Sequence, residues 1–175
     1  MDSPVKSAVR VLGVDPGMSG AAFLIGCGSV HGFRDFKSKR ELANRVADLA
    51  KNCDYAVMEL VHAMPGQGVC SMFSFGRSSG VADGALALTV PERRIEEVSP
   101  QKWQNFYRNL FGVSRKQQFD AVQIASRLDP LFLPYLTRKK DHNSADAILI
   151  ASWKILSGTN LEPLASLHGI APRHD

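Results

Sequence analysis

The sequence pattern is clearest in "AVRVLGVDPGMSGAAFLIG", residues 8–26. Residues 8–15 form an apolar run rich in β-branched side chains that stops at Pro16-Gly17, which predicts a buried strand ending in a turn. Apolar runs at 21–26 and 30–36 follow, each bounded by glycine, and they predict two more strands. We therefore expect an antiparallel meander of three strands at the start of the fold.

Beyond the meander, helical periods alternate with short apolar runs. Residues 38–53 repeat apolar side chains at helical spacing, with Ser38 as the expected N-cap and Glu41 three residues later. Strands are expected at 54–60 and 94–100. The other expected helices span 70–90, 100–111, 114–128 (opened by Ser114) and 145–156. Hairpin strands joined to helix-linked strands predict an α/β fold, a mixed sheet flanked by helices.

Length and composition predict one domain over residues 1–175, with a core at about 8–157 and a tail at 158–175. With 45% hydrophobic and 22% charged residues, the composition is that of ordinary globular proteins. No apolar run approaches the roughly 20 residues that span a bilayer, so we expect no membrane partner. No targeting segment is visible, which favours the cytoplasm of a bacterial or phage-infected cell, or an organellar nucleoid. Three scattered cysteines are expected to be reduced thiols.

Charge is unevenly distributed along the chain. The net charge is +4, and the stretch from Arg93 to Lys140 holds ten Lys or Arg against four Asp or Glu, a net +6. The remainder carries −2. A basic half suggests a polyanionic partner on one face, although an unevenly charged solvated surface is equally compatible.

Two acids follow predicted strands. Asp15 ends the first strand, and Glu59 ends the run "YAVMEL" between Met58 and Leu60. A carboxylate at the end of an apolar strand loses contact with water, so it requires a hydrogen-bond donor, a cationic side chain or a metal ion. If the two strands are neighbours, the carboxylates approach closely, and oxygen-only ligands favour Mg²⁺ or Mn²⁺. The alternative for Asp15 is an ordinary turn aspartate before Pro-Gly.

Two more acids lie in "KKDHNSADAILIASW", residues 139–153. Asp146 follows the expected N-cap Asn143 by three residues, which also suits a capping box. Asp141 precedes the helix in a basic loop, where an ion pair with a neighbouring lysine is the alternative. On one continuous helix the two acids would point about 140° apart, so both reach one metal only if Asp141 folds back. His142 is either an auxiliary ligand or an exposed side chain.

Together the acids suit phosphodiester hydrolysis. Four carboxylates around two divalent cations would activate water and stabilise the leaving oxygen, while nearby cations hold the backbone phosphates. Surface solvation remains the alternative for the cations. The predicted phosphate contacts are Arg115, Lys116, Arg138, Lys139 and Lys140.

Three blocks in this order resemble the RuvC-type Holliday junction resolvases, particularly their phage and chloroplast members. The blocks are "GVDPGMSGAAFLI", "VMELVHAMPGQGVCSMFSFGRSSG" and "KKDHNSADAILIASW". The resemblance implies an RNase H-like fold, a homodimer, Mg²⁺ or Mn²⁺, and paired symmetric cuts at a four-way DNA junction. It implies that the catalytic and metal-binding acids are Asp15, Glu59, Asp141 and Asp146.

The chain departs from bacterial RuvC at two positions. The partner of Asp146 would fall at Asn143 in that pattern, whereas here the acid lies two residues earlier, as in the chloroplast-like members. This departure leaves the role of Asp141 open. His62 stands where bacterial RuvC has an aromatic residue that helps to open the junction, so junction opening is expected to use other residues.

Three other classes compete with a junction resolvase. A related nuclease on the same fold, acting on flaps, forks or RNA–DNA hybrids, would have the same active site and a different DNA-facing surface. An actin-like ATP-binding protein also starts with a strand ending in an acid, but it needs two lobes and about 300 residues. A non-catalytic DNA-binding module would not require the four acids.

Overall fold

The computed structural model describes residues 9–17, 20–60, 62, 66, 68–138 and 140–158. Five strands form one sheet in the order β3-β2-β1-β4-β5. The first three pair antiparallel, and β4 and β5 extend the sheet in parallel with β1. The predicted mixed sheet is therefore confirmed. The strands are β1 (Val11–Asp15), β2 (Ala21–Gly26), β3 (Ser29–Arg34), β4 (Tyr55–Glu59) and β5 (Ile95–Val98).

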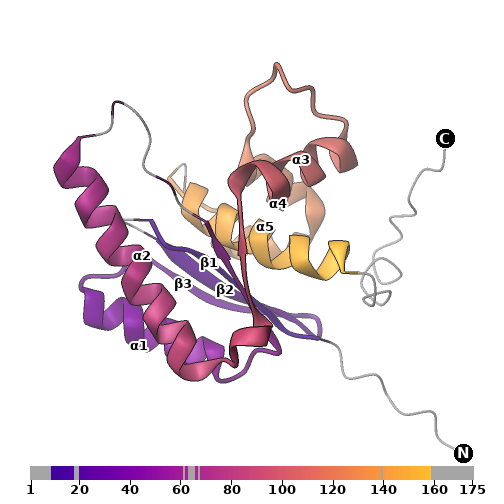
Figure 1. Ribbon diagram of the computed structural model, residues 1–175. Coiled ribbons are helices and arrows are strands. Elements are labelled where there is room, and N and C mark those ends of the chain that lie inside the picture. The colour runs from indigo at the N-terminus through magenta and orange to yellow at the C-terminus, as the bar shows by residue number, and fades with distance from the viewer. Residues whose placement is uncertain are drawn as a thin grey trace, which may run out of the picture.

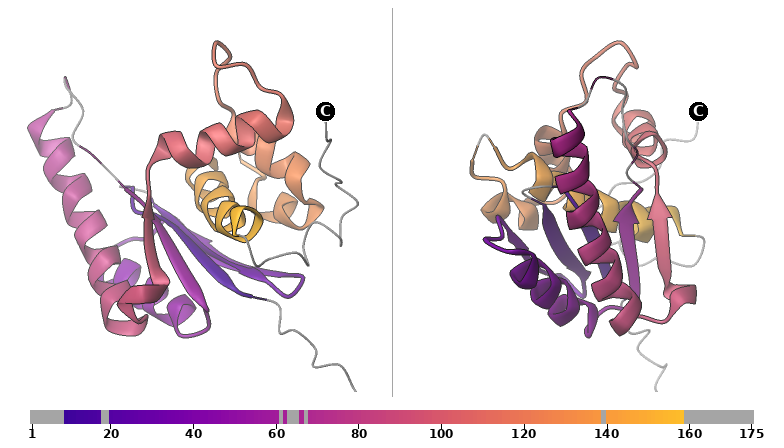
Figure 2. Two further views of the ribbon diagram at one scale, coloured as in Figure 1. Left: turned by 45° about the vertical axis from the view of Figure 1, so that its right-hand side comes forward. Right: turned by 60° about the vertical axis from the view of Figure 1, so that its left-hand side comes forward.

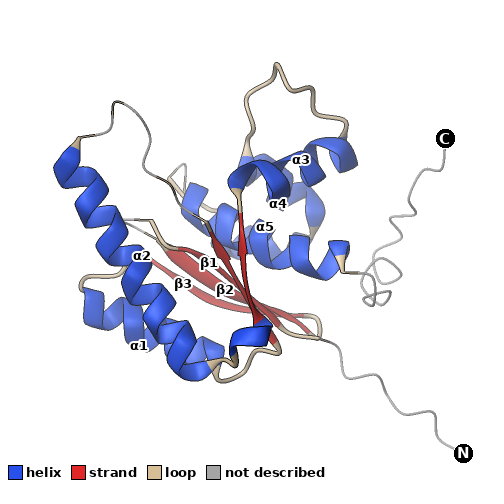
Figure 3. Ribbon diagram, viewed as in Figure 1, coloured by secondary structure: helices blue, strands red, loops and turns tan. Residues whose placement is uncertain are grey.

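Helices link and cover these strands (Figures 1 and 3). The α-helices are α1 (Lys39–Ala50), α2 (Val69–Thr89), α3 (Pro100–Phe111), α4 (Ala121–Leu128) and α5 (His142–Ser157). Two short 3₁₀ segments are η1 (Glu92–Arg94) and η2 (Pro130–Tyr135). The expected tail lies outside the described residues beyond residue 158. Among the helices that the structure describes, none combines the length and apolar character needed to cross a membrane.

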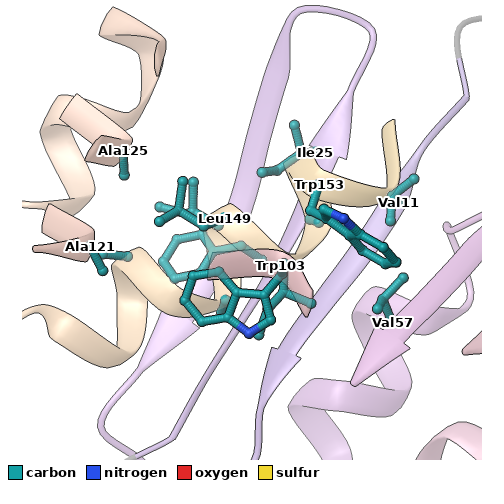
Figure 4. Packing of buried hydrophobic residues seen from close by; sticks show 14 of the residues in the cluster. Val11, Ile25, Val57, Trp103, Ala121, Ala125, Leu149 and Trp153 are labelled. Carbon is teal, nitrogen blue, oxygen red and sulfur yellow. The ribbon is translucent and has the colours of Figure 1, made fainter. Parts of the chain in front are cut away.

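The helices lie on both faces of the sheet (Figure 2). Each face of the sheet carries its own hydrophobic core, and successive side chains of β1 enter them alternately. Leu12 and Val14 pack toward α1 and α2, whereas Val11 packs toward α3, α4 and α5. On the second face Trp103 and Leu149 fill the space between α4 and the sheet (Figure 4). This arrangement explains why the strands read as continuous apolar runs.

Gly13 brings α5 unusually close to the centre of the sheet. A Cβ at Gly13 would lie 2.1 Å from the Ala147 carbonyl oxygen and 2.6 Å from the Ala151 nitrogen. Any side chain at this position would therefore collide with the α5 backbone. The glycine lets the helix lie directly on β1, next to the strand end that carries Asp15.

The predicted cap of α1 is confirmed. Ser38 Oγ accepts a hydrogen bond from the Glu41 backbone N–H, and a Glu41 carboxylate oxygen accepts one from the Lys37 N–H. The Ser38 bond satisfies an amide of the first helical turn, and the Glu41 bond ties the residue before the cap to the helix.

The helix predicted over 114–128 is wrong in its first half. The α4 helix begins only at Ala121, where Asp120 is the N-cap and accepts from the Gln123 N–H. Arg108 Nη1 donates to the carbonyls of Ser114 and Gln117, at 2.8 and 3.0 Å. Because the Arg108 side chain of α3 donates hydrogen bonds to these carbonyls, residues 112–120 form a loop instead of a helical turn.

Candidate active site

Carboxylates from three elements meet at one end of the sheet. Asp15 is the last residue of β1, and Glu59 is the last residue of β4. The two strands are parallel neighbours with Val14 opposite Met58, so both acids emerge at the same edge. Asp146 lies in the second turn of α5, the helix that packs on β1. The condition on which the approach of Asp15 and Glu59 depended, that the two strands lie side by side, is thus met.

Asp15 is held in a buried position with its charge poorly compensated. Its side chain turns back so that Oδ1 accepts from the Gly17 N–H at 3.1 Å. Burial and the nearby charge of Glu59 raise its pKa to about 7, against a smaller lowering effect of the Gly17 hydrogen bond. A carboxylate with this pKa is only about half ionised at pH 7, and a bound cation would favour the ionised form.

Trp103 of α3 fixes the orientation of Glu59. The indole Nε1–H donates to Glu59 Oε1 at 3.0 Å, and the ring is fully buried. Phe119 packs edge-on against Trp103 at 5.4 Å between ring centroids, which locks the indole in place. Burial raises the pKa of Glu59, and the indole hydrogen bond partly offsets that effect.

Asp146 is the third acid of the group, and it lies close enough to Asp15 and Glu59 to feel their negative charges. Burial raises its pKa to about 8, with further contributions from the negative charges of Asp15 and Glu59. Each of the three acids thus has a raised pKa. Among the described residues, none of the three forms an ion pair with a lysine or arginine.

The chemistry of these three side chains fits a hard divalent cation. They offer oxygen ligands only, are partly desolvated, and have no positive partner among the described residues, which is the donor set that Mg²⁺ and Mn²⁺ prefer. Their geometry is not that of a finished site, because the described residues contain no set of three acids, histidines or cysteines arranged to hold an ion. Cation binding therefore requires the carboxylates to close around it.

Asp141 is placed differently from the other acids. Its side chain is buried and pairs with Arg34 of β3 and with Arg138, each at 2.7 Å. Burial alone would raise its pKa, but the Arg138 N–H, the Arg138 guanidinium and the Arg34 charge outweigh burial and lower it. These two ion pairs set Asp141 apart from the other three acids, none of which has such a partner among the described residues.

The start of α5 explains this separation. The helix begins at His142 with Asp141 in the N-cap position, so Asn143 is not the cap and the capping-box interpretation of Asp146 is wrong. Asp141 therefore belongs to the same continuous helix start and does not fold back over it. His142 is the first residue of the helix, and its side chain is exposed.

The predicted phosphate contacts divide into two groups. Arg115 and Lys116 are exposed on the α3–α4 loop, which projects on the side toward which β4 and β5 point (Figure 2). Lys140 is also exposed, and Lys139 lies outside the described residues. Arg138 is already engaged, since its guanidinium also pairs with Asp35 at 2.7 Å.

Sequence reasoning missed Gly13, Arg34 and Trp103. A glycine inside a β-branched strand is a signal of close backbone approach that was available for Gly13. Nothing local distinguishes Arg34 or Trp103, because their partners lie 107 and 44 residues away along the chain.

No protein-family model matches the sequence, and no curated protein matches it either. Solved structures do match. Thermus thermophilus RuvC is 18% identical with a TM-score of 0.58, over 86% of this chain and 98% of that one. The yeast mitochondrial Holliday junction resolvase Ydc2 is 17% identical with a TM-score of 0.55, over 87% of this chain and 80% of that one.

A second structure of T. thermophilus RuvC, in complex with a Holliday junction substrate, is 16% identical with a TM-score of 0.55. That match covers 86% of this chain and 98% of the other. The chain therefore has the RuvC fold, and the predicted RNase H-like fold class is confirmed.

Proposed function

We propose that this protein is a divalent-metal-dependent endonuclease that resolves four-way DNA junctions as a homodimer. The observation that carries the proposal is the meeting of Asp15, Glu59 and Asp146 at one edge of a RuvC-like sheet. Similarity to RuvC bound to a Holliday junction, at the level of fold, supports branched DNA as the substrate class.

Mg²⁺ or Mn²⁺, two per site, would be held by Asp15, Glu59 and Asp146, and would supply Lewis-acid stabilisation of the phosphodiester being cut. The chain's own residues prepare the site. The Gly17 N–H orients Asp15 and the Trp103 indole orients Glu59. Asp15 and Asp146, with pKa values of about 7 and about 8, would lose their remaining protons if a cation bound between them.

Exposed cations would hold the DNA backbone. Arg115, Lys116 and Lys140 are exposed side chains that can reach phosphates without first breaking an ion pair with another described residue. Contacts to phosphates give affinity without sequence preference. Such contacts suit a nuclease that recognises the shape of a junction.

A cleavage assay on a synthetic four-way junction tests the function directly, with duplex, flap and RNA–DNA hybrid controls, with and without Mg²⁺. We expect metal-dependent, paired cuts in the junction. Asp15→Asn, Glu59→Gln and Asp146→Asn should each slow cleavage by about 100-fold or more and leave junction binding intact or tighter. Asp48→Asn, an exposed carboxylate on α1, is the matched control and should cut normally.

Cleavage of flaps or hybrids in preference to junctions would instead assign the site to a related nuclease on the same fold. Absence of metal-dependent cleavage on every substrate would refute the nuclease proposal. Normal cutting by one of the three acid variants would remove that residue from the site.

The dimer interface is proposed on α2. A stripe along this helix combines apolar residues at both ends with glycines between them, and Val69, Phe73 and Leu88 are 78%, 69% and 89% exposed. A Cβ at Gly76, Gly80 or Gly84 would meet nothing within 4 Å. A second copy of the chain is the proposed occupant, because two symmetric cuts require two active sites at a fixed separation.

Sedimentation of the wild type and of Gly80→Arg tests this interface. The arginine has open space in one protomer, so the variant should fold and sediment as a monomer. A wild type that is monomeric both free and on the junction would contradict the dimer. An unaltered Gly80→Arg dimer would move the interface away from α2.

A further inference from the structure

The carboxylate of Asp141 is surrounded by donors from two arginines. Oδ1 accepts from Arg138 Nε at 2.7 Å and forms an ion pair with Arg138 Nη2, also at 2.7 Å. Oδ2 accepts from the Arg138 backbone N–H at 2.8 Å and from Arg34 Nη1 at 2.7 Å. A carboxylate has about four lone-pair sites, so these three hydrogen bonds and one ion pair occupy its accepting capacity. A metal could bind Asp141 only after at least one of these bonds breaks.

The same contacts join segments that are distant in the chain. Arg34 ends β3, and its Nη1 also donates to the Tyr135 carbonyl at 2.7 Å. Arg138 reaches Asp35, which follows β3. The Tyr135 hydroxyl donates to the Val30 carbonyl at 2.7 Å, within β3. We call Arg34, Asp35, Arg138 and Asp141 the Asp141 cluster. It fastens the loop before α5 to the outer strand of the sheet.

The Asp141 cluster is connected to the clustered acids through the backbone of α5. The Asp141 carbonyl accepts from the Ala145 N–H at 3.0 Å, the first hydrogen bond of the helix. Asp146 follows directly, and Ala147 is the residue whose carbonyl lies against Gly13. A shift at the start of α5 therefore moves Asp146 relative to Asp15, and a displacement of about 1 Å can lower a rate by roughly 100-fold.

We propose that Asp141, held by Arg34 and Arg138, is a positioning residue that fixes the start of α5 and thereby Asp146, and is not a fourth metal ligand. This assignment rests on the proposed function for its catalytic consequence. It gives Arg138 a different role from phosphate binding, and it adds Arg34 to the residues on which the active site depends.

Substitution of Arg34 distinguishes the two possible roles of Asp141, because each role predicts a change in Mn²⁺ affinity in the opposite direction. If Asp141 were a ligand, Arg34→Gln would free its carboxylate, remove a competing positive charge, and tighten Mn²⁺ binding. If Asp141 is a positioning residue, Arg34→Gln and Asp141→Asn should both weaken Mn²⁺ binding. Electron paramagnetic resonance of free Mn²⁺ measures this affinity without any cleavage step.

Single-turnover cleavage at saturating protein gives the second measurement. We expect Asp141→Asn and Arg34→Gln each to lower the rate by about 100-fold, and the double variant to be no slower, because both changes break the same Arg34–Asp141 contact. Arg34→Lys should recover much of the loss, since both Arg34 contacts use one nitrogen, Nη1. Arg45→Gln, in an exposed α1 ion pair, is the matched control and should change neither readout.

Thermal unfolding ensures that every variant is compared in its folded state. Loss of a buried ion-pair partner should lower Tm by about 10 °C, and Arg34→Lys remains testable if the other variants do not fold. Tighter Mn²⁺ binding in Arg34→Gln, or additive losses in the double variant, would overturn the assignment. If the wild type cuts no junction, the proposed function fails, while the Mn²⁺ titrations still determine whether Asp141 is a ligand.

Discussion

Asp15, Glu59 and Asp146, the clustered acids, should destabilise the metal-free fold above neutral pH. Asp15 provides the clearest test of this expectation. Its pKa rises from an ordinary 3.8 to about 7, because of burial and then the Glu59 charge. The folded state therefore keeps a proton that the unfolded state releases. Stability falls as pH rises from about 4 to about 7 and is level above that range, and a shift of about three units corresponds to about 4 kcal/mol.

Asp15→Asn removes this ionisation and keeps the shape of the side chain. The asparagine oxygen can still accept from the Gly17 N–H, so the turn after β1 should survive. We expect the variant to be more stable than the wild type by about 4 kcal/mol at pH 8 in a metal chelator, and by about 1–2 kcal/mol at pH 5.

Urea unfolding at several pH values, in chelator and in Mn²⁺, measures the difference. Mn²⁺ should stabilise the wild type more than the variant, because a ligand stabilises the state that binds it. Asp48→Asn, whose carboxylate is exposed, should change stability little at any pH. A difference between Asp15→Asn and wild type that does not grow between pH 5 and pH 8 would refute the reasoning.

Three further outcomes are expected. Trp103→Phe keeps the buried ring but loses the donor to Glu59, and should lower the cleavage rate by about 10- to 100-fold in a single-turnover assay. Gly13→Ala places a methyl group against the Ala147 carbonyl and should lower the free energy of unfolding by about 3 kcal/mol in urea titrations. Replacing Arg115 and Lys116 together by Gln should make the salt dependence of junction binding shallower by about 0.9 per lost phosphate contact, and an unchanged slope would mean that both are merely solvated.

Local patterns were sufficient for most of the fold. Glycine-bounded apolar runs marked the strands of the meander, and Ser38 with Glu41 marked the start of α1 through bonds that span only a few residues. The α3–α4 loop was not predictable in this way. Its conformation depends on a side chain of α3, Arg108, which binds carbonyls that the sequence pattern assigned to a helix.

Whether the clustered acids could be predicted depended on whether the pairing of the strands could be predicted. Parallel strands place their carboxyl ends together, so the expected approach of Asp15 and Glu59 depended on β1 and β4 being neighbours, which the structure shows. The support around them was not predictable, because Trp103 approaches Glu59 from another element. Positioning contacts depend on tertiary packing, and a single sequence carries no local mark of them.

Asp141 illustrates why residue type and spacing leave a role undecided. Local sequence offered an acid near the start of a helix, flanked by cations, and this pattern suits both a metal ligand and an ion pair. The deciding partner, Arg34, is 107 residues away, at the end of β3. Since β3 is the outer strand beside β2, the pairing forms only once the meander and α5 are packed on each other. The contact that keeps Asp141 away from the clustered acids is thus a consequence of the fold, and it also fixes the helix that carries Asp146.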